Sequence, residues 1–290
     1  MNNKENDNTD KILGMNRIMF FIIVALLCVL SLSIGIYAQV FYRYSDTDPL
    51  MLGIGVGKTQ NKAELIALKN SFDNIFTNDL EGSTKVQNIK LKNDKNGIVY
   101  TYQKVSQKDD DKYNIVASLP KINIDSIYAE KINSQINSNY ADRIEGILTK
   151  TDQYIDYGVS YKAYLNGDLL SLIIKETVYE GSENQTEKIQ TYNYNLNNNT
   201  EVSMMDIVKA KKYNQKQLQN DIYREIDEIN EKAKQLKSQY SEVKIRDKNN
   251  SMYKLENTEN FAVNPDGYVY IIYSYGNTEN TNTKDILVFE

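Results

Sequence analysis

The stretch YGVSYKAYLNGDLLSLIIKETV, residues 157–178, decides the fold of this chain. Alternate residues from Tyr157 to Leu165 are apolar, which is typical of a strand with one buried face. Asn166-Gly167 is a favoured two-residue hairpin turn, and the chain returns from Leu169 to Val178 as a strongly apolar strand. A further strand is expected from Lys188 to Leu196. The pattern therefore predicts an antiparallel sheet whose strands are joined by tight turns.

Helical patterns alternate with these strands. Apolar residues at helical spacing predict helices over residues 126–148 and 215–240, and the second is expected to pack on a sheet more readily than to form a coiled coil. Shorter helices are expected to start at Asn61 and at Ser203, where Asp206 completes a capping box. Further strands are expected over residues 98–105, 113–119 (ending at Pro120), 261–263, 268–275 and 285–289. Helices interleaved with hairpins predict an α+β fold.

The first part of the chain has the pattern of a membrane anchor. Residues 18–40 contain no charged side chain and are long enough to cross a bilayer of roughly 30 Å as a single helix. A cleaved signal peptide is the alternative, but its apolar core is usually shorter. Lys4, Lys11 and Arg17 precede the span and Arg43 follows it, which favours a cytoplasmic amino terminus. We expect a cytoplasmic tail at 1–17, a transmembrane helix at 18–40, a linker at 41–60, and an extracytoplasmic remainder.

Composition excludes several classes of function. The chain has no histidine, and its single cysteine is Cys28. It therefore lacks a Ser-His-Asp or Cys-His catalytic set, an ordinary zinc site and an internal disulfide. The formal net charge is −5 and no basic stripe is present, so nucleic acid is not an expected partner. No metal or cofactor is expected.

Several segments resemble a known family. Four segments resemble parts of the PdaC-type extracytoplasmic domain. They are Ser118-Leu119-Pro120-Lys121-Ile122-Asn123 with Ile132-Asn133, Leu169-Leu170-Ser171-Leu172, Thr191-Tyr192-Asn193-Tyr194-Asn195-Leu196 and Ser203-Met204-Met205-Asp206. Phe261 and Gly267-Tyr268-Val269-Tyr270-Ile271-Ile272-Tyr273 resemble the companion carboxy-terminal domain of RsiV-like proteins. Those proteins are membrane-anchored anti-sigma factors whose outer part senses lysozyme. The resemblance implies a PdaC-like α+β domain at 61–200 and an RsiV-like α+β domain at 201–290.

This chain differs from both kinds of relative in the parts that carry out their known activities. Residues 1–17 are mostly polar without helical periodicity, which is too little for an evident sigma-binding module. The peptidoglycan deacetylase relative carries a separate catalytic domain that binds metal partly through histidine, and this chain has neither. The resemblance therefore implies a binding architecture, and we expect the protein not to be an enzyme.

A hydrolase that uses paired carboxylates is the alternative of a different class. Glu176 and Glu180 share one face of a strand, although a solvated sheet edge is the favoured interpretation of the pair. Asp109-Asp110-Asp111 is interpreted as a loop, and the flanking lysines Lys108 and Lys112 oppose a calcium site there.

Tyrosines provide the best candidates for ligand contact, because the side chain combines a large apolar body with a hydroxyl group. The candidates are Tyr192, Tyr194, Tyr268, Tyr270, Tyr273 and Tyr275. Packing inside the sheet is the competing role for each of them. The sequence thus predicts a membrane-anchored, non-catalytic binding or sensing protein of the bacterial cell surface, with a cell-wall glycan or a protein such as lysozyme as partner. The alternatives are the carboxylate hydrolase and a structural envelope protein.

Overall fold

The computed structural model describes residues 11–12, 15–16, 58–149, 153–181, 185–237, 243–274 and 284–290. The predicted membrane span at 18–40 lies outside these residues, as does Tyr275. Within the described ranges, no helix is both long and apolar enough to cross a membrane. The chain divides into two compact units, residues 1–64 and 65–290. In the first unit, β1 (Lys11–Ile12) and β2 (Met15–Asn16) form a short antiparallel pair.

Helix α2 (Lys58–Asn70) spans the boundary between the units and begins at Lys58, so the expected start at Asn61 is wrong. A 3₁₀ turn, η2 (Phe72–Asn74), follows it.

The second unit is built on a seven-stranded sheet. Its strands run in the order β4 (Val99–Asp109), β5 (Tyr113–Ile122), β6 (Ile155–Gly167), β7 (Leu169–Glu180), β8 (Thr186–Asn195) and β9 (Thr200–Glu201), while β3 (Leu80–Thr84) also pairs with β6. The β6–β7 hairpin is present as the sequence predicts, but β5 and β3 both run parallel to β6. The sheet is therefore mixed, which corrects the prediction of an antiparallel sheet.

A helical crossover explains the parallel pair. Between β5 and β6 the chain forms α3 (Ile127–Ile136), a π-helical turn η3 (Asn137–Ala141) and α4 (Asp142–Thr149). A crossover of this length is what parallel neighbours require. Ser126 caps α3 by accepting a hydrogen bond from the Ala129 amide at 3.1 Å. The apolar face of these helices covers the sheet, so the helix predicted over 126–148 is confirmed.

A second sheet covers the opposite face of the first. Strands β10 (Phe261–Val263), β11 (Val269–Ser274) and β12 (Lys284–Phe289) are antiparallel. Buried residues of both sheets pack together there, with Tyr164, Ile173 and Ile189 on the larger sheet against Tyr270, Ile272 and Ile286 on the smaller. Helices α5 (Met204–Ala210) and α6 (Gln215–Lys237) cover the outer face of the smaller sheet, together with the 3₁₀ turns η4 (Ser251–Tyr253) and η5 (Leu255–Asn257).

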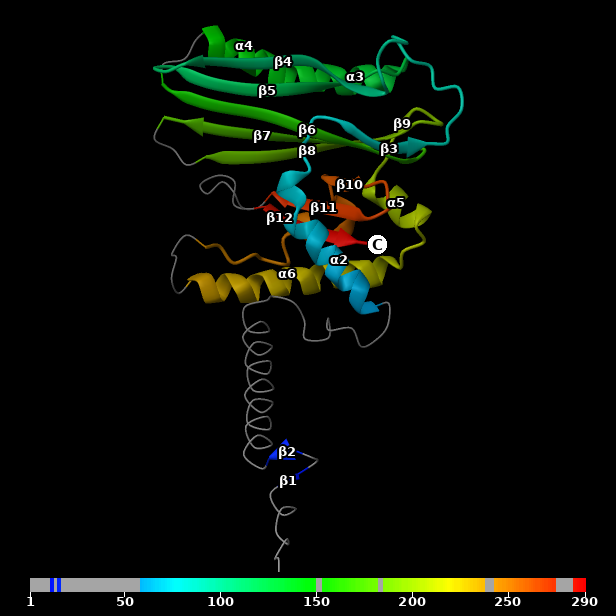
Figure 1. Cartoon of the computed structure of the whole chain (residues 1–290). Helices are drawn as coiled ribbons and strands as arrows, with labels where there is room; N and C mark the ends of the chain where they lie inside the picture. Colours follow the sequence, from blue (N-terminus) through cyan, green and yellow to red (C-terminus); the bar gives the residue numbers. More distant parts are fainter. Residues whose placement is uncertain are drawn as a thin grey trace, which may run out of the picture. The chain divides into compact units, whose positions relative to one another are not determined.

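The second unit therefore has four layers: helices, seven-stranded sheet, three-stranded sheet, helices (Figure 1). This arrangement confirms the α+β class. The long helix α6 starts at Gln215 and packs on a sheet, as the sequence predicts.

Two local predictions need correction. Strand β5 continues through Pro120 to Ile122, although Pro120 was expected to end it. The missing N–H is tolerated because β5 pairs with β6 only as far as Ala117, and beyond that point the Asn133 side chain of α3 replaces a strand neighbour. The Asn133 amide accepts from the Ile122 N–H and donates to the Ile122 carbonyl, each at 2.8 Å.

The β6–β7 turn also lies one residue later than expected. Asn166 pairs with Leu169, which places Gly167-Asp168 in the loop, and Gly167 has a φ of 63°. Glycine adopts this left-handed conformation without the steric cost of a Cβ.

Candidate functional site

Three hollows follow one another along the second unit. Hollow A has a volume of about 360 Å³, hollow B about 370 Å³ and hollow C about 570 Å³. Hollows A and B share Glu201 and Val202, while hollows B and C share Thr258 and Glu259. The shared walls make the three hollows neighbours in a row, with the short edge strand β9 between the first two.

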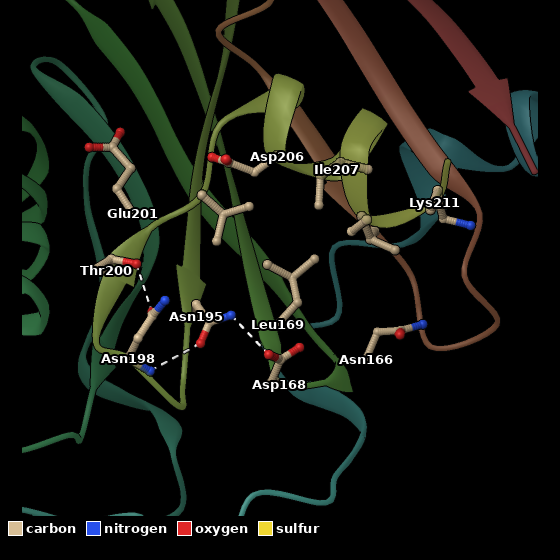
Figure 2. A pocket seen from close by; sticks show the side chains of 13 residues that line it. Asn166, Asp168, Leu169, Asn195, Asn198, Thr200, Glu201, Asp206, Ile207 and Lys211 are labelled. Carbon is tan, nitrogen blue, oxygen red and sulfur yellow. Dashed lines mark hydrogen bonds between the residues drawn. The ribbon is translucent and has the colours of Figure 1, made fainter. Parts of the chain in front are cut away.

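Hollow A lies between the tip of the β6–β7 hairpin, the β8–β9 turn and α5 (Figure 2). Its lining residues are Asn166, Asp168, Leu169, Asn195, Asn198, Thr200, Glu201, Val202, Asp206, Ile207, Ala210, Lys211 and Val263. The Asp168 carboxylate accepts hydrogen bonds from the side-chain amides of Asn195 at 2.9 Å and Asn197 at 3.3 Å. These bonds fix one wall of the hollow, which presents carboxylate and amide groups.

Two charged groups from the α5 region complete hollow A. Asp206 forms the predicted capping box with Ser203, and hydrogen bonds from the Ser203 hydroxyl and N–H hold the pKa of the carboxyl below its usual value. Lys211 follows the end of α5, where burial lowers the pKa of its ammonium group and Glu290 opposes that effect. Figure 2 shows Lys211 and Asp206 on different parts of the rim.

Hollow B lies where the α3–η3 helix passes β8 and β9. Its lining residues are Tyr128, Lys131, Gln135, Asn139, Gln190, Thr191, Tyr192, Asn193, Glu201, Val202, Ser203, Thr258, Glu259 and Phe261. Asn139 belongs to the π-helical turn, a rare feature that occurs often at functional sites.

Tyr128 and Tyr192 supply the aromatic surface of hollow B. The Tyr128 ring stacks on that of Tyr194 with 5.7 Å between ring centroids, and the Lys131 ammonium lies 5.6 Å from the Tyr128 centroid. Burial raises the pKa of the Tyr128 phenol, and a hydrogen bond with Glu201 raises it further. Burial also raises the pKa of Tyr192, where a hydrogen bond with Asn139 has the opposite effect. Both phenols are therefore neutral at physiological pH and can donate a hydrogen bond.

Hollow C is lined by Ser251, Met252, Glu256, Asn257, Thr258, Glu259, Asn260, Ile272, Tyr273 and Ser274. Glu256 and Glu259 are its charged residues, and both are exposed. The Tyr273 hydroxyl and the Thr258 hydroxyl are buried without a hydrogen-bond partner. Burial raises the pKa of Tyr273 to about 12, and the nearby Thr258 lowers it to a lesser extent, although the two hydroxyls lack the geometry of a hydrogen bond.

The structure places the six tyrosines that the sequence singled out in different environments. Tyr194, Tyr268, Tyr270 and Tyr273 have buried side chains, which is the packing role that the sequence also allowed. Tyr192 is half-buried and lines hollow B. Sequence reasoning missed Tyr128, Lys131 and Asn139, because single polar or aromatic residues on an amphipathic helix give no indication of a site.

The carboxylate pair considered for hydrolysis is not on a solvated edge. Glu176 is buried with 6% exposure, and it accepts hydrogen bonds from Arg143 at 3.1 Å and from the Tyr157 hydroxyl at 2.9 Å. The interpretation as a solvated edge is therefore wrong for Glu176, which forms a polar contact between α4 and the sheet.

The acidic run at 109–111 lies in the β4–β5 turn, as expected. Lys108 pairs with Asp110 at 2.6 Å and Lys112 with Asp109 at 3.8 Å. Across the ranges that the structure describes, no cluster of three or more histidine, cysteine, aspartate or glutamate residues is placed to hold a metal ion.

Comparison with known proteins finds solved structures that are similar to this chain. No protein-family model and no curated protein matches the sequence. A DUF3298 family protein from Pseudomonas aeruginosa PAO1 matches with a TM-score of 0.39 and 10% identity, over 65% of this chain and 86% of that chain. A DUF3298 family member from Bacteroides fragilis NCTC 9343 matches with a TM-score of 0.33 and 12% identity, over 61% and 81% of the two chains. The finer resemblance to RsiV-like and PdaC-type proteins stays a prediction.

Proposed function

We propose that this chain is a membrane-anchored, non-catalytic binding protein of the bacterial cell envelope, and that hollows A, B and C together hold a linear glycan. The three neighbouring hollows, which share lining residues, are the observation that carries the proposal. A compact ligand fills one hollow, whereas a chain of repeating units can occupy several neighbouring hollows at once.

The chemistry of the walls suits a carbohydrate. Sugars present hydroxyl and amide groups at their edges and C–H groups on their ring faces. The side-chain amides of Asn195 and Asn198 in hollow A, and of Gln135 and Asn139 in hollow B, can form hydrogen bonds with the hydroxyl and amide groups of a sugar. Tyr128 and Tyr192 have flat apolar ring faces on which the C–H groups of a sugar ring can pack, and each also carries a hydroxyl group.

Two aspartates of hollow A, and the glutamate that the sequence offered for hydrolysis, favour binding over hydrolysis. Asp168 and Asp206 are held by hydrogen bonds from neighbouring side chains, and Glu176 is bonded to Arg143 and Tyr157 inside the fold. A catalytic acid needs a pKa raised towards neutrality, but hydrogen bonding lowers the pKa of Asp206.

The membrane anchor and the outward orientation of the second unit are part of the same proposal. They rest on the uncharged stretch at 18–40 and on the basic residues that precede it. A protein anchored in this way holds a glycan-binding unit next to the cell wall.

Co-sedimentation of the full-length protein in lipid nanodiscs with insoluble cell-wall glycan tests this function. We expect the wild-type protein to sediment, and Tyr192→Ala and Asn139→Ala to weaken binding by roughly tenfold or more, equivalent to about 1.4 kcal/mol. Tyr179→Ala is the matched control, because Tyr179 is exposed on β7 and lines none of the three hollows.

Two results would overturn the proposal. One is failure of the wild-type protein to sediment with any glycan, particularly if it binds lysozyme in a parallel arm. The other is release of soluble sugar fragments that stops when a single carboxylate is replaced by its amide.

A further inference from the structure

Hollow B differs from hollows A and C in having partly exposed aromatic rings. Tyr128 and Tyr192 line it and are half-buried, whereas Tyr273 in hollow C is buried and the described lining of hollow A contains no aromatic residue. An aromatic ring supplies a flat apolar surface on which the C–H groups of a sugar ring can pack. Hollow B is therefore the part of the row that is suited to hold a sugar ring by its face.

One edge of the helix that runs through α3 and η3 presents polar side chains to hollow B. Lys131, Gln135 and Asn139 recur every four residues along this edge, and all three line the hollow. The side-chain amides of Gln135 and Asn139 are on exposed residues, so a ligand in the hollow can reach them. Asn139 forms a hydrogen bond with the Tyr192 phenol, and the Gln135 side chain has no hydrogen bond within the described part of the chain.

The charged residues of hollow B have both signs. Lys131 lies in the same lining as Glu201 and Glu259, and the Tyr128 phenol forms a hydrogen bond with Glu201. All three charged residues are exposed, so water and salt screen their charges. Selection of a ligand by charge is therefore weaker in this hollow than selection by hydrogen bonds and apolar contact.

An acetamido group matches the uncharged part of this lining. It presents one N–H donor, one carbonyl acceptor and a methyl group. A side-chain amide of asparagine or glutamine carries a donor and an acceptor, so it can pair with both polar atoms of the acetamido group. Val202, half-buried in the wall that hollows A and B share, provides an apolar contact for the methyl group. The volume of about 370 Å³ lies within the range of small-molecule pockets, roughly 300–1,000 Å³.

We propose that hollow B is the subsite that selects a sugar unit carrying an acetamido group, with Gln135 and Asn139 bonding its N–H and carbonyl and Tyr192 packing on the ring face. This inference rests on the proposed glycan-binding function and names the class of unit that is bound. A hydroxyl group at the same ring position has one polar heavy atom in place of two and no methyl group, so it makes fewer of these contacts.

Three sets of oligosaccharides of equal length and linkage test the selectivity: oligomers of N-acetylglucosamine, of glucosamine and of glucose, which differ in one ring substituent. Calorimetric titration uses the full-length protein in nanodiscs at neutral pH. We expect the N-acetylglucosamine oligomers to bind roughly tenfold more tightly than either other set, equivalent to about 1.4 kcal/mol.

Variants of the helix edge locate the selectivity in hollow B. Asn139→Leu should weaken binding of the N-acetylglucosamine oligomers to the level of the glucose oligomers and leave binding of the glucose oligomers unchanged. Gln135→Leu should also reduce the preference. Both residues are exposed, so thermal unfolding should match that of the wild-type protein. Gln107→Leu is the matched control, because it makes the same amide-to-leucine change at an exposed position on β4 that lines none of the three hollows.

The outcomes separate the two proposals. Three results overturn the assignment of hollow B and leave the glycan-binding function in place: equal binding of the N-acetylglucosamine and glucose oligomers, tightest binding of the glucosamine oligomers, or a preference that survives both leucine variants. Absence of binding by all three sets overturns both proposals.

Discussion

The side-chain amide of Asn193 on β8 donates a hydrogen bond of 2.8 Å to the main-chain carbonyl of Phe261 on β10. This bond joins the larger sheet to the outer edge of the smaller one. Two more bonds accompany it: the Phe261 N–H donates to the Thr191 hydroxyl at 3.1 Å, and the Val263 N–H donates to the Ser171 hydroxyl at 3.1 Å. The Ser171 hydroxyl in turn donates to the Asn193 side chain at 2.7 Å.

Replacing Asn193 by leucine should destabilise the second unit by about 1–3 kcal/mol. The substitution removes the donor to the buried Phe261 carbonyl and the acceptor for the buried Ser171 hydroxyl, which keeps only its bond from the Val263 N–H, and an unpaired buried group carries a desolvation cost of that order. Urea unfolding followed by circular dichroism measures the change. Asn249→Leu, at an exposed position, is the control and should unfold like the wild-type protein. A loss of stability equal in both variants would show that the Asn193 contact contributes little.

The three side chains of the larger sheet that form these bonds show what can and cannot be predicted from the sequence. Ser171, Thr191 and Asn193 lie in segments that the family resemblance picked out, and their strands were located correctly. Their role as partners for a strand edge depends on how the two sheets stack, and periodicity within a strand contains no information about stacking. The parallel pairing of β3 and β5 with β6 was missed for the same reason, since pairing between distant segments is not encoded locally.

Ile132→Asp and Ile136→Asp should each abolish cooperative folding of the second unit. Ile132 is 1% exposed and Ile136 is 0% exposed, both on the helix that covers the larger sheet. Burying an unpaired carboxylate costs several kcal/mol, comparable with the roughly 5–15 kcal/mol stability of a domain. Ile127→Asp is the matched control on the same helix, because Ile127 is 89% exposed. Cooperative melting of Ile132→Asp at the wild-type temperature would refute this packing.

Asp285→Asn should lower the stability by about 3–5 kcal/mol, because the nearly buried Arg246 loses the carboxylate that accepts two of its hydrogen bonds. The Arg246 guanidinium donates to both carboxylate oxygens of Asp285, at 3.0 and 2.8 Å, and thereby ties the segment after α6 to β12. The double variant Arg246→Met/Asp285→Leu should recover much of the loss, since both members of the buried pair are then apolar. Thermal unfolding of the three proteins measures this coupling. Equal destabilisation in the single and double variants would contradict it.

Alkaline pH should destabilise the second unit between about pH 10 and pH 12. Burial raises the pKa of Tyr270 and of Tyr273 to about 12 in the folded protein, whereas the phenols of the unfolded chain ionise near pH 10. Unfolding therefore releases protons in this window. The stabilising contribution is complete below about pH 10 and is lost as the pH rises through the folded pKa.

Urea midpoints measured across this pH window, together with tyrosinate absorbance, check the expectation. Tyr270→Phe should make the loss of stability with pH shallower. A midpoint that stays constant up to about pH 12 would contradict the raised pKa values.

Protease added to intact cells should remove the second unit and leave a small membrane-bound fragment, because we expect everything after about Phe41 to lie outside. An epitope placed before Lys4 should stay protected on that fragment. Survival of the full-length chain, under treatment that digests known surface proteins, would overturn the orientation.

Hollows A, B and C could be predicted only in part from the sequence. Tyr192 was selected for its residue type, and it does line hollow B. Glu201, Thr258 and Glu259 form the walls between hollows, yet each occupies a short edge strand or an irregular segment where no periodicity applies. Such residues become recognisable only when the two sheets bring segments near positions 130, 200 and 260 together.

The hydrogen bonds along the outer edge of β10 affect how readily the protein aggregates at high concentration. An open strand edge offers main-chain groups to which another molecule can add a strand, and this is a common start of aggregation. In this fold, side chains of the neighbouring sheet already occupy the N–H and carbonyl groups of Phe261 and the N–H of Val263. The contacts that hold the two sheets together therefore also keep this edge from recruiting other chains at high protein concentration.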